Sequence, residues 1–567
     1  AAEAAYRKGL KLRPGHATAA KLEMANALRL QGKPREAIAV LDGRVLSTGS
    51  LESMKPWLSR YEYTVDNTLH DKVIMPGFIE PHSHTWMSAG FMGMHFIGPI
   101  PLPSPSGGMN PPLTSYDQVV DHLRKLHEEE KDPTKPLIAW GFDPANQGGA
   151  LDRDMLDEKV SKDRPVFVIA FAPHFAYLNS AALELVKLPE NVMNNPGVKH
   201  YPDGRLNGIF AEPAAVLPAI APIMGEINRL GGLQGLKFMA GIAQRVGITT
   251  IGELTFGVMD FDAELHDHKA ATADPSYPLR QRLTPLASVV VGQHGDKAVE
   301  FVESLKEHET DKLYFKGVKF FTDGSFPLMG SLVQFPGYLD GTNGQQGDPN
   351  VVELMRPFWK AGHQLHCHAN GDQALQITLD ALAELQATHP RFDHRFTVEH
   401  FSMSTPMQIR RLKALGGIAS VNGYFIHFRS LLHRTNAYGP DRSEVVARLG
   451  TLEREGITFA LHSDYPQVVV PLEPLTVAWA AVNRIAEDNK TVVGPNEKIS
   501  VERAMRAITI DAAYICGMED KVGSLEEGKF ADFTILEEDP FEVDPLHLKD
   551  ISIWGTALSG KLFEVSE

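Results

Sequence analysis

Short apolar segments with strand character recur along the chain and alternate with helical patterns. They lie at 73–79, 248–253, 279–287, 314–321, 364–368, 396–400, 417–422 and 458–462. Helical periodicity marks most of the stretches between them, for example 351–362, 374–388 and 406–415. Eight strands that alternate with helices predict an α/β protein built on a closed (β/α)8 TIM barrel. In such a barrel the catalytic groups gather at the carboxyl ends of the strands.

The sequence predicts additions to this barrel, which itself would occupy residues 73–519. A large insertion follows the first strand at about 86–245, and its proline-rich stretch suits a lid or a contact within a homo-oligomer. Strand-like segments at 37–72 and 520–567 predict a small discontinuous β domain built from both ends of the chain.

Residues 1–36 show helical spacing of apolar side chains and resemble a single tetratricopeptide helix pair. One repeat does not bury its own apolar face. The segment therefore predicts a helical hairpin docked on the main body, with a protein-interaction module as the alternative.

Composition restricts the partners and the compartment. A formal net charge of −16 argues against nucleic acid and against an anionic membrane surface as partners. No apolar run reaches the roughly 18 residues that span a bilayer. The two cysteines, Cys367 and Cys516, exclude a disulfide framework and favour a reducing, cytoplasmic compartment. A chain that starts at Ala1 without methionine is also compatible with a trimmed signal peptide. We expect a soluble enzyme with a small-molecule substrate.

Side chains that bind metal ions follow several of the predicted strands. His82 and His84 come two positions apart after the first strand, so they project to the same side. His368 ends the fifth strand, His400 ends the sixth, and Asp464 follows the eighth. Neutral histidine is a common ligand of zinc and similar metals. The convergence of these residues on one mouth of the barrel predicts a metal site.

Lys319 lies inside the apolar run of the fourth strand. A buried ammonium group beside a metal ion would be penalised by desolvation and by like charge. Reaction of the neutral amine with carbon dioxide would give a carbamate, an anion whose two oxygens can bridge two metal ions. Other groups on these strands are interpreted as core residues: satisfied histidines at His366, His394 and His462, and a packed thiol at Cys367.

Five motifs resemble a known family. They are P-G-F-I-E-P-H-S-H, V-K-F-F-T-D-G-S, H-A-N-G-D, V-E-H and H-S-D-Y-P. Together they resemble the metal-dependent amidohydrolase superfamily and, within it, amidohydrolase family 3, which includes N-substituted formamide deformylases. The resemblance runs from about residue 37 to residue 567. The chain departs from the family pattern at His462, where glycine is usual, and at Asn370.

The resemblance implies a ligand set and a reaction. His82, His84 and Asp464 would hold one divalent metal ion. His368 and His400 would hold a second, with carboxylated Lys319 bridging the pair. A metal-activated hydroxide would attack an amide or cyclic amide, and Asp464 would pass its proton to the leaving amine.

Several alternatives remain open at this point. Zinc suits the nitrogen-rich ligands, manganese and iron are alternatives, and a one-metal site also fits. A heterocycle deaminase with a single metal is the competing enzyme, although Lys319 argues against it. A protein-interaction module acting through the N-terminal helices is the competing function of another class.

Candidate substrate-binding residues surround this mouth. Trp86 belongs to a cluster of methionines and aromatic residues that would line an apolar cavity or pack a lid. His174 is a candidate by the family resemblance, and Asp323 follows the fourth strand. Tyr424 and His427 follow the seventh strand. An apolar pocket would favour an amide that carries an aromatic or alkyl group.

Overall fold

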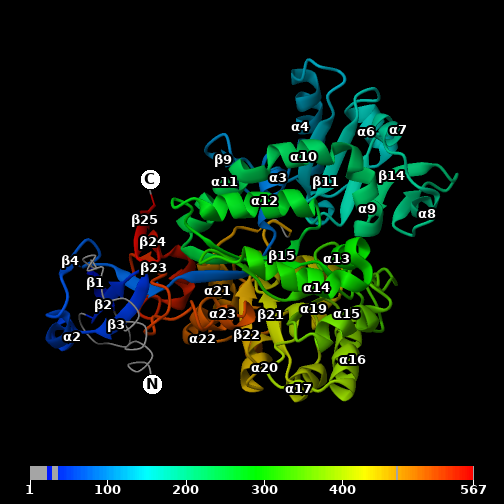
Figure 1. The fold of residues 1–567 in the computed structure, drawn as a ribbon. Helices are drawn as coiled ribbons and strands as arrows, with labels where there is room; N and C mark the ends of the chain where they lie inside the picture. The colour runs from blue at the N-terminus through cyan, green and yellow to red at the C-terminus, as the bar shows by residue number, and fades with distance from the viewer. Residues whose placement is uncertain (1–21, 29–35, 468–469, 566–567) are drawn as a thin grey trace.

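The computed structural model describes residues 22–28, 36–467 and 470–565. Its central feature is a ring of parallel strands (Figure 1). These strands are β6 (Phe78–Ser83), β15 (Ile248–Phe256), β16 (Arg280–Pro285), β17 (Leu313–Phe315), β18 (Val318–Phe321), β19 (Leu365–Ala369), β20 (Thr397–His400), β21 (Ile418–Asn422) and β22 (Phe459–His462). They pair in the orders β17-β16-β15-β6 and β18-β19-β20-β21-β22.

Two junctions join these sheets into a closed barrel. On one side, Leu286 forms a parallel bridge with Lys319 at the start of β18. On the other side, the backbone N–H of Asp464 donates to the carbonyl of His82 at 3.2 Å, just beyond the end of β22. The predicted TIM barrel is therefore present, with the ends of β6 and β22 in direct contact.

Two predicted barrel strands are divided in the structure. The segment predicted at 73–79 is divided into β5 (Val73–Pro76), which pairs with β23 (Phe533–Leu536) outside the barrel, and β6. Gly77 separates them, and a Cβ atom there would lie 2.0 Å from the Thr249 hydroxyl oxygen. The segment predicted at 314–321 is interrupted by Gly317, whose φ of +74° is unfavourable for other residues.

Helices between the strands cover the outside of the barrel (Figure 1). They are α12 (Phe261–Ala273), α13 (Ala287–His294), α14 (Ala298–Ser304), α15 (Val351–Lys360), α16 (Asp372–Thr388), α17 (Pro406–Ala414), α18 (Tyr424–Asn436), α19 (Pro440–Ser443), α20 (Leu449–Arg454), α21 (Pro474–Asn483), α22 (Val501–Ala507) and α23 (Ile510–Ile515). The helices predicted at 351–362, 374–388 and 406–415 correspond to α15, α16 and α17. A capping box of Thr405 and Gln408 starts α17. Every helix in the described part of the chain is too short or too polar to cross a bilayer.

The segment between β6 and β15 forms a separate layer above the barrel (cyan in Figure 1). Its sheet has the order β13-β14-β12-β11-β10-β7. The strands are β7 (His95–Phe96), β10 (Leu137–Phe142), β11 (Val166–Ala170), β12 (Phe175–Leu178), β13 (Val198–His200) and β14 (Leu206–Ala211). The helices are α3 (Thr85–Met92), α4 (Tyr116–Glu129), α5 (Pro144–Gln147), α6 (Arg153–Lys159), α7 (Ser180–Leu185), α8 (Glu190–Met193), α9 (Pro213–Ile220), α10 (Met224–Leu230) and α11 (Gly232–Arg245). The proline-rich stretch forms a small hairpin of β8 (Leu102–Pro103) and β9 (Met109–Asn110).

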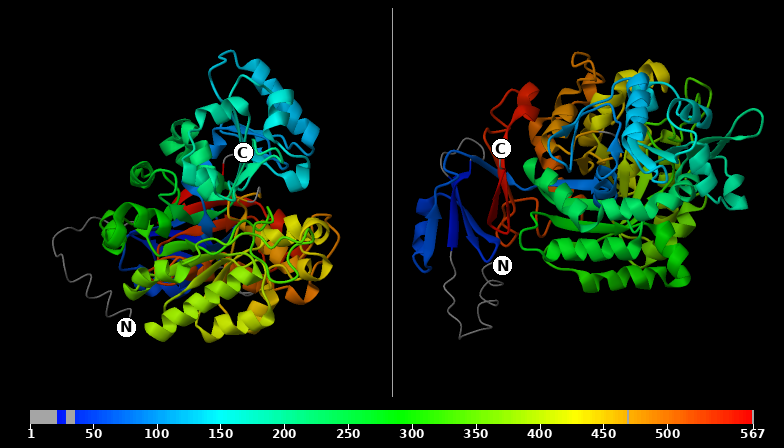
Figure 2. Two further views of the ribbon diagram at one scale, coloured as in Figure 1. Left: turned by 90° about the vertical axis from the view of Figure 1, so that its right-hand side faces the viewer. Right: turned by 90° about the horizontal axis from the view of Figure 1, so that it is seen from above.

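Two further four-stranded sheets lie beside the barrel (Figure 2): one contains strands of the N-terminal segment alone, and the other joins N-terminal β5 to three C-terminal strands. They have the orders β3-β2-β1-β4 and β25-β24-β23-β5. The strands not yet introduced are β1 (Leu22–Leu28), β2 (Glu36–Leu41), β3 (Arg44–Gly49), β4 (Tyr63–Asp66), β24 (Ile553–Leu558) and β25 (Lys561–Glu564), with α2 (Leu51–Leu58) beside them. Ile38, Ile74 and Phe533 share one apolar cluster between the two ends.

The helix predicted over residues 1–36 is wrong where the structure describes that segment. Leu22–Leu28 forms β1, which pairs antiparallel with β2 and parallel with β4. Pairing on both edges satisfies its backbone groups, and this tertiary contact overrides the local helical propensity of Leu, Glu, Met and Ala. The rest of the predicted helix, at 1–21 and 29–35, lies outside the described residues.

Candidate active site

A cavity of about 840 Å³ lies at the carboxyl ends of the barrel strands, where side chains of the insertion meet those of the barrel. All six residues predicted to bind metal line it: His82, His84, Lys319, His368, His400 and Asp464. The insertion contributes His174, Glu212 and Leu217, among others. A segment that follows β18 adds Asp323 and Phe326. The barrel rim and the insertion therefore build one site together.

Asp464 faces both histidines of the H-x-H motif. Its Oδ1 atom lies 3.1 Å from His84 Nε2 and 3.4 Å from His82 Nε2. One ligand atom from each of these three buried residues lies within 4.8 Å of the others, as a shared metal ion would require. Asp464 has a φ of 61°, a backbone conformation that residues other than glycine rarely adopt. Such backbone strain is concentrated at functional sites.

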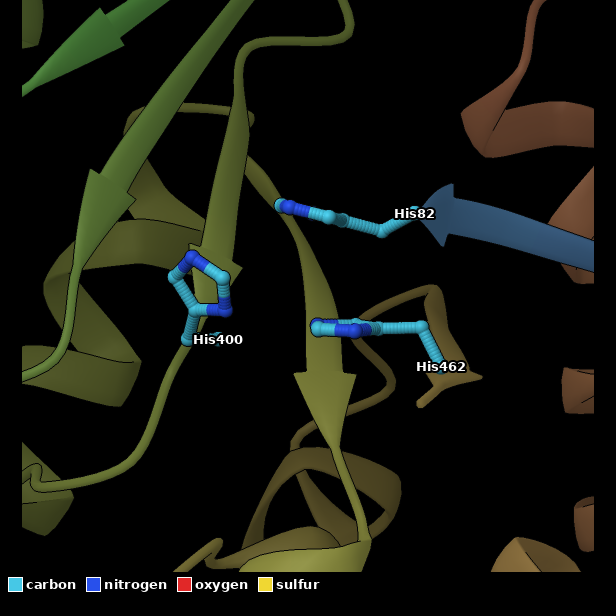
Figure 3. A group of neighbouring side chains, drawn as sticks. All are labelled: His82, His400 and His462. Atoms are coloured by element: carbon cyan, nitrogen blue, oxygen red, sulfur yellow. The ribbon is translucent and has the colours of Figure 1, made fainter. Parts of the chain in front are cut away.

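A second group of histidines adjoins the first. His82, His400 and His462 converge from three barrel strands (Figure 3). The His82 ring stacks on His462 with 4.5 Å between centroids and lies 4.6 Å from the ring of His400. The His368 ring packs edge-on against His400 at 4.4 Å. The predicted convergence of imidazoles is therefore present, and it includes His462.

The protonation of these rings suits metal binding. Burial lowers the pKa of His82 and of His400 well below the usual value, and neighbouring cationic groups lower it further. Both rings are therefore neutral, the form in which imidazole binds a metal. In the described part of the chain, His400 Nδ1 and both ring nitrogens of His462 have no hydrogen-bond partner.

Buried polar atoms are nearly always paired, and a metal ion would satisfy nitrogens of this kind. The residues present therefore fit a divalent metal ion. The prediction that His462 is a satisfied core histidine is wrong. The same prediction is confirmed for His394, which bonds the carbonyl of Leu415 through Nε2 and accepts the N–H of Phe396 at Nδ1.

Lys319 is buried as the sequence predicts, with 1% of its surface exposed. Its Nζ atom lies 3.4 Å from His82 Nε2. Burial lowers the pKa of Lys319, which favours the neutral amine. Cys367, on the neighbouring strand, is a packed thiol as predicted, and burial raises its pKa to about 12.

Asp323 lines the cavity, but its carboxylate is occupied by the backbone. It accepts the N–H groups of Leu332, Asn370 and Gly371 at 2.7–3.0 Å. One of its oxygens also lies 3.3 Å from His368 Nε2. Asp323 therefore fixes the loop beside His368, and its contact with substrate stays a prediction.

His174 lines the cavity from the insertion side, as predicted. Its Nδ1 atom lies 2.6 Å from the carboxylate of Glu212. Burial opposes a charge on the ring, yet the nearby carboxylate of Glu212 raises the pKa of His174 overall. Glu212 itself has a strained φ of 66° and was not predicted from the sequence.

Three residues predicted to bind substrate do not line the cavity. Met87 and Phe91 occupy the face of α3 that lines the cavity. Trp86 lies on another face of this helix, where its indole N–H donates to Asp267. The other two lie on α18, which starts directly after β21 and directs them away from the cavity. The Tyr424 hydroxyl donates to the carbonyl of Glu473, and His427 Nδ1 donates to that of Ile485.

Glu399 is a site residue that sequence reasoning missed. Its two oxygens lie 2.6 Å from His82 Nδ1 and 2.6 Å from His366 Nδ1. Burial would raise its pKa, but the hydrogen bond and charge interaction with His366, together with nearby Lys319 and His462, lower the pKa of Glu399 to about 2. The available signal was an acidic residue placed inside the apolar strand F-T-V-E-H-F.

Several known proteins are similar to this chain over most of its length. The sequence pattern of the Amidohydrolase family matches residues 68–563. The chain is 26% identical over 548 residues to the putative amidohydrolase YtcJ of Bacillus subtilis, covering 94% of this chain and 96% of that protein. It is 24% identical over 550 residues to the N-substituted formamide deformylase of Arthrobacter pascens, covering 93% and 94%.

A solved structure shares the fold. An uncharacterised metal-dependent hydrolase of Pyrococcus horikoshii superposes with a TM-score of 0.67 at 20% identity, covering 93% of this chain and 99% of that one. The family pattern extends over both the barrel and the strands at its two ends. The chain belongs to the amidohydrolase family and is a hydrolase of carbon–nitrogen bonds.

Proposed function

We propose that this protein is a metal-dependent hydrolase of an amide or cyclic amide whose substituents are apolar or aromatic. The proposal rests on the observation that six potential metal ligands line one cavity. They lie on, or directly after, five different barrel strands and are His82, His84, Lys319, His368, His400 and Asp464.

The ligands divide into two groups around Lys319. His82, His84 and Asp464 would hold one divalent ion, and His368 and His400 would hold a second. Zinc suits this nitrogen-rich set. A bound ion would lower the pKa of a water molecule towards neutrality and polarise the carbonyl group of the substrate.

Asp464 is placed to move the proton. Its Oδ1 atom faces His82 and His84, and its Oδ2 atom lies 3.5 Å from His400 Nδ1. During hydrolysis a carbon–oxygen bond forms, the carbon–nitrogen bond breaks, and one proton moves from water to the leaving nitrogen. Asp464 accepts that proton from water and then donates it to the amine, which makes it general base and general acid in turn.

Lys319 would act as a carbamate. The neutral Nζ atom would attack carbon dioxide, form a nitrogen–carbon bond and release one proton. The anion would remove the conflict between a buried ammonium group and nearby metal ions. Burial of Lys319 and the proximity of its Nζ atom to His82 support this assignment.

The cavity walls support an uncharged, apolar substrate. Apolar side chains predominate above the ligands: Met87, Phe91, Val216, Leu217, Ile220, Val258, Met259 and Phe326. Among the described residues that line the cavity, Lys319 is the only lysine or arginine. The carboxylates of Glu212, Asp323 and Asp348 also line it. A substrate with a negative charge would therefore meet repulsion from these carboxylates.

The test pairs a substrate series with variants of one ligand. Neutral N-alkyl and N-aryl amides and uncharged cyclic amides should be hydrolysed by the zinc-loaded protein, whereas charged dipeptides should not. Lys319→Ala should lose metal and activity together, with partial recovery on addition of a short carboxylic acid. Lys316→Ala, a change outside the cavity, is the matched control and should retain both. Full metal content and activity in Lys319→Ala, or turnover of charged dipeptides alone, would contradict the proposal.

A further inference from the structure

A chain of buried hydrogen bonds runs from Arg282 to the ligand His82. Arg282 on β16 contacts His366 Nε2 on β19 through its Nη2 atom. His366 Nδ1 lies 2.6 Å from one oxygen of Glu399 on β20, and the other oxygen lies 2.6 Å from His82 Nδ1. All four residues are at most 1% exposed. This series of hydrogen bonds therefore crosses the barrel interior without access to solvent.

The donors and acceptors along this chain follow from its first member. A guanidinium group only donates, so His366 Nε2 accepts and the proton of the His366 ring lies on Nδ1. That N–H donates to Glu399, whose carboxylate acts as an acceptor at both ends. His82 Nδ1 then carries the proton that donates to Glu399. The Nε2 atom of His82 is left with a free lone pair, and this atom faces Asp464.

The backbone leaves room for the contact between Arg282 and His366. Gly317 separates β17 from β18 with a φ of +74°. A Cβ atom at this position would lie 2.7 Å from Cδ2 and 2.9 Å from Nε2 of His366, and 3.2 Å from Arg282 Nη2. A side chain there would displace the Arg282–His366 pair.

Packing alone does not explain why the charged guanidinium group of Arg282 is buried. In the described part of the chain its Nε and Nη1 atoms have no hydrogen-bond partner. A buried charge of this kind is strongly destabilising unless it is compensated. Here its positive charge lies at one end of the chain that contains the Glu399 carboxylate, so the arrangement is explained by what it does to His82.

We propose that Arg282, His366 and Glu399 are positioning residues that hold His82 in the tautomer whose Nε2 atom binds the metal ion. The inference rests on the proposed metal site. Residues that hydrogen-bond to a metal-binding side chain fix its orientation and strengthen its bond to the metal. Their loss typically weakens metal binding about 10- to 100-fold.

The test compares two arginines on the same strand. Arg280 is also fully buried on β16, but it pairs with Asp532 in a contact remote from the cavity. Arg282→Met should weaken zinc binding about 10- to 100-fold in a chelator competition on the full-length protein. It should also change the visible spectrum of the cobalt-loaded protein, because that spectrum reports ligand geometry. Arg280→Met should lower thermal stability and leave both measurements unchanged.

Two further variants keep the inference falsifiable if Arg282→Met does not fold. Arg282→Lys preserves the charge and should recover part of the zinc affinity. Gly317→Ala removes no charge and should also weaken zinc binding about 10-fold. Wild-type affinity and spectrum in Arg282→Met or Gly317→Ala would overturn the inference while the proposed hydrolase stands. A wild-type protein that binds no metal would instead contradict the proposed function.

Discussion

His84 Nε2 lies 3.1 Å from Asp464 Oδ1, although 380 positions separate the two residues in the chain. The contact exists because β6 and β22 adjoin where the barrel closes, which places the ends of its first and last strands together. Closure of the barrel therefore assembles the group that we propose to hold metal and to transfer the proton.

Asp464→Asn should reduce hydrolysis strongly. The amide keeps the shape of the side chain but removes the charge and the ability to accept a proton, so kcat/KM should fall about 10²- to 10⁴-fold. Zinc affinity should fall as well. Steady-state kinetics at saturating zinc measures the first effect, with the exposed Asp441→Asn as control. Activity within twofold of wild type would exclude the proposed role.

Asp323→Asn should lower the stability of the fold and have little effect on kcat. Asn offers a single acceptor oxygen where the carboxylate accepts three backbone N–H groups. At least one donor would be left unpaired, at a cost of about 1–3 kcal/mol in the free energy of unfolding. Denaturant titration measures this change. An unchanged midpoint with a large loss of kcat would show instead that Asp323 acts on the substrate.

Leu217→Ala should weaken substrate binding without affecting the chemical step. Leu217 lines the apolar wall contributed by α9, away from the ligands. For a substrate with an alkyl or aromatic arm, KM should rise about 10-fold at constant kcat, because apolar contact area is lost. Leu185→Ala, on an exposed face of α7, should leave KM unchanged. A fall in kcat alone would contradict this assignment of the wall.

Acid should destabilise the protein partly through His433. This ring is buried against Phe326 and Tyr438, and burial lowers its pKa to about 3 from an ordinary value of 6.5. Between these values the unfolded chain binds one more proton at this position than the folded chain. The free energy of unfolding should therefore fall as pH drops from about 6.5 towards 3, by up to about 1.4 kcal/mol per pH unit.

The His433→Asn variant isolates that contribution. Denaturant titrations at pH 7, 6 and 5 should show a shallower pH dependence than wild type, by close to one proton. The exposed His200→Asn should keep the wild-type slope. An identical slope in wild type and His433→Asn would show that the ring is already charged in the folded protein.

The sequence predicted the barrel and the cavity ligands for a shared physical reason. Strands alternating with helices define a barrel, and a barrel places strand ends at one rim, so His82, His368 and His400 could be grouped from their positions alone. Residues just beyond strand ends were less predictable. Tyr424 and His427 follow β21 as expected, but the immediate start of α18 directs them away from the cavity.

Pairing between distant strands was the main feature that local patterns did not reveal. His366 and Glu399 look like core residues within their own strands, yet together they connect Arg282 to His82. The sequence predicts a satisfied core histidine at His462, whereas the structure stacks its ring on His82 and leaves both its nitrogens without a hydrogen-bond partner among the described residues. Each of these relations depends on strands brought together by the fold.

Anomalous diffraction at the zinc edge, on crystals of the zinc-loaded protein, would locate the proposed metal ions. We expect a peak bounded by His82, His84 and Asp464, a second bounded by His368 and His400, and added density on Lys319 Nζ. Peaks confined to the protein surface, with these six side chains unchanged around an empty cavity, would contradict this expectation.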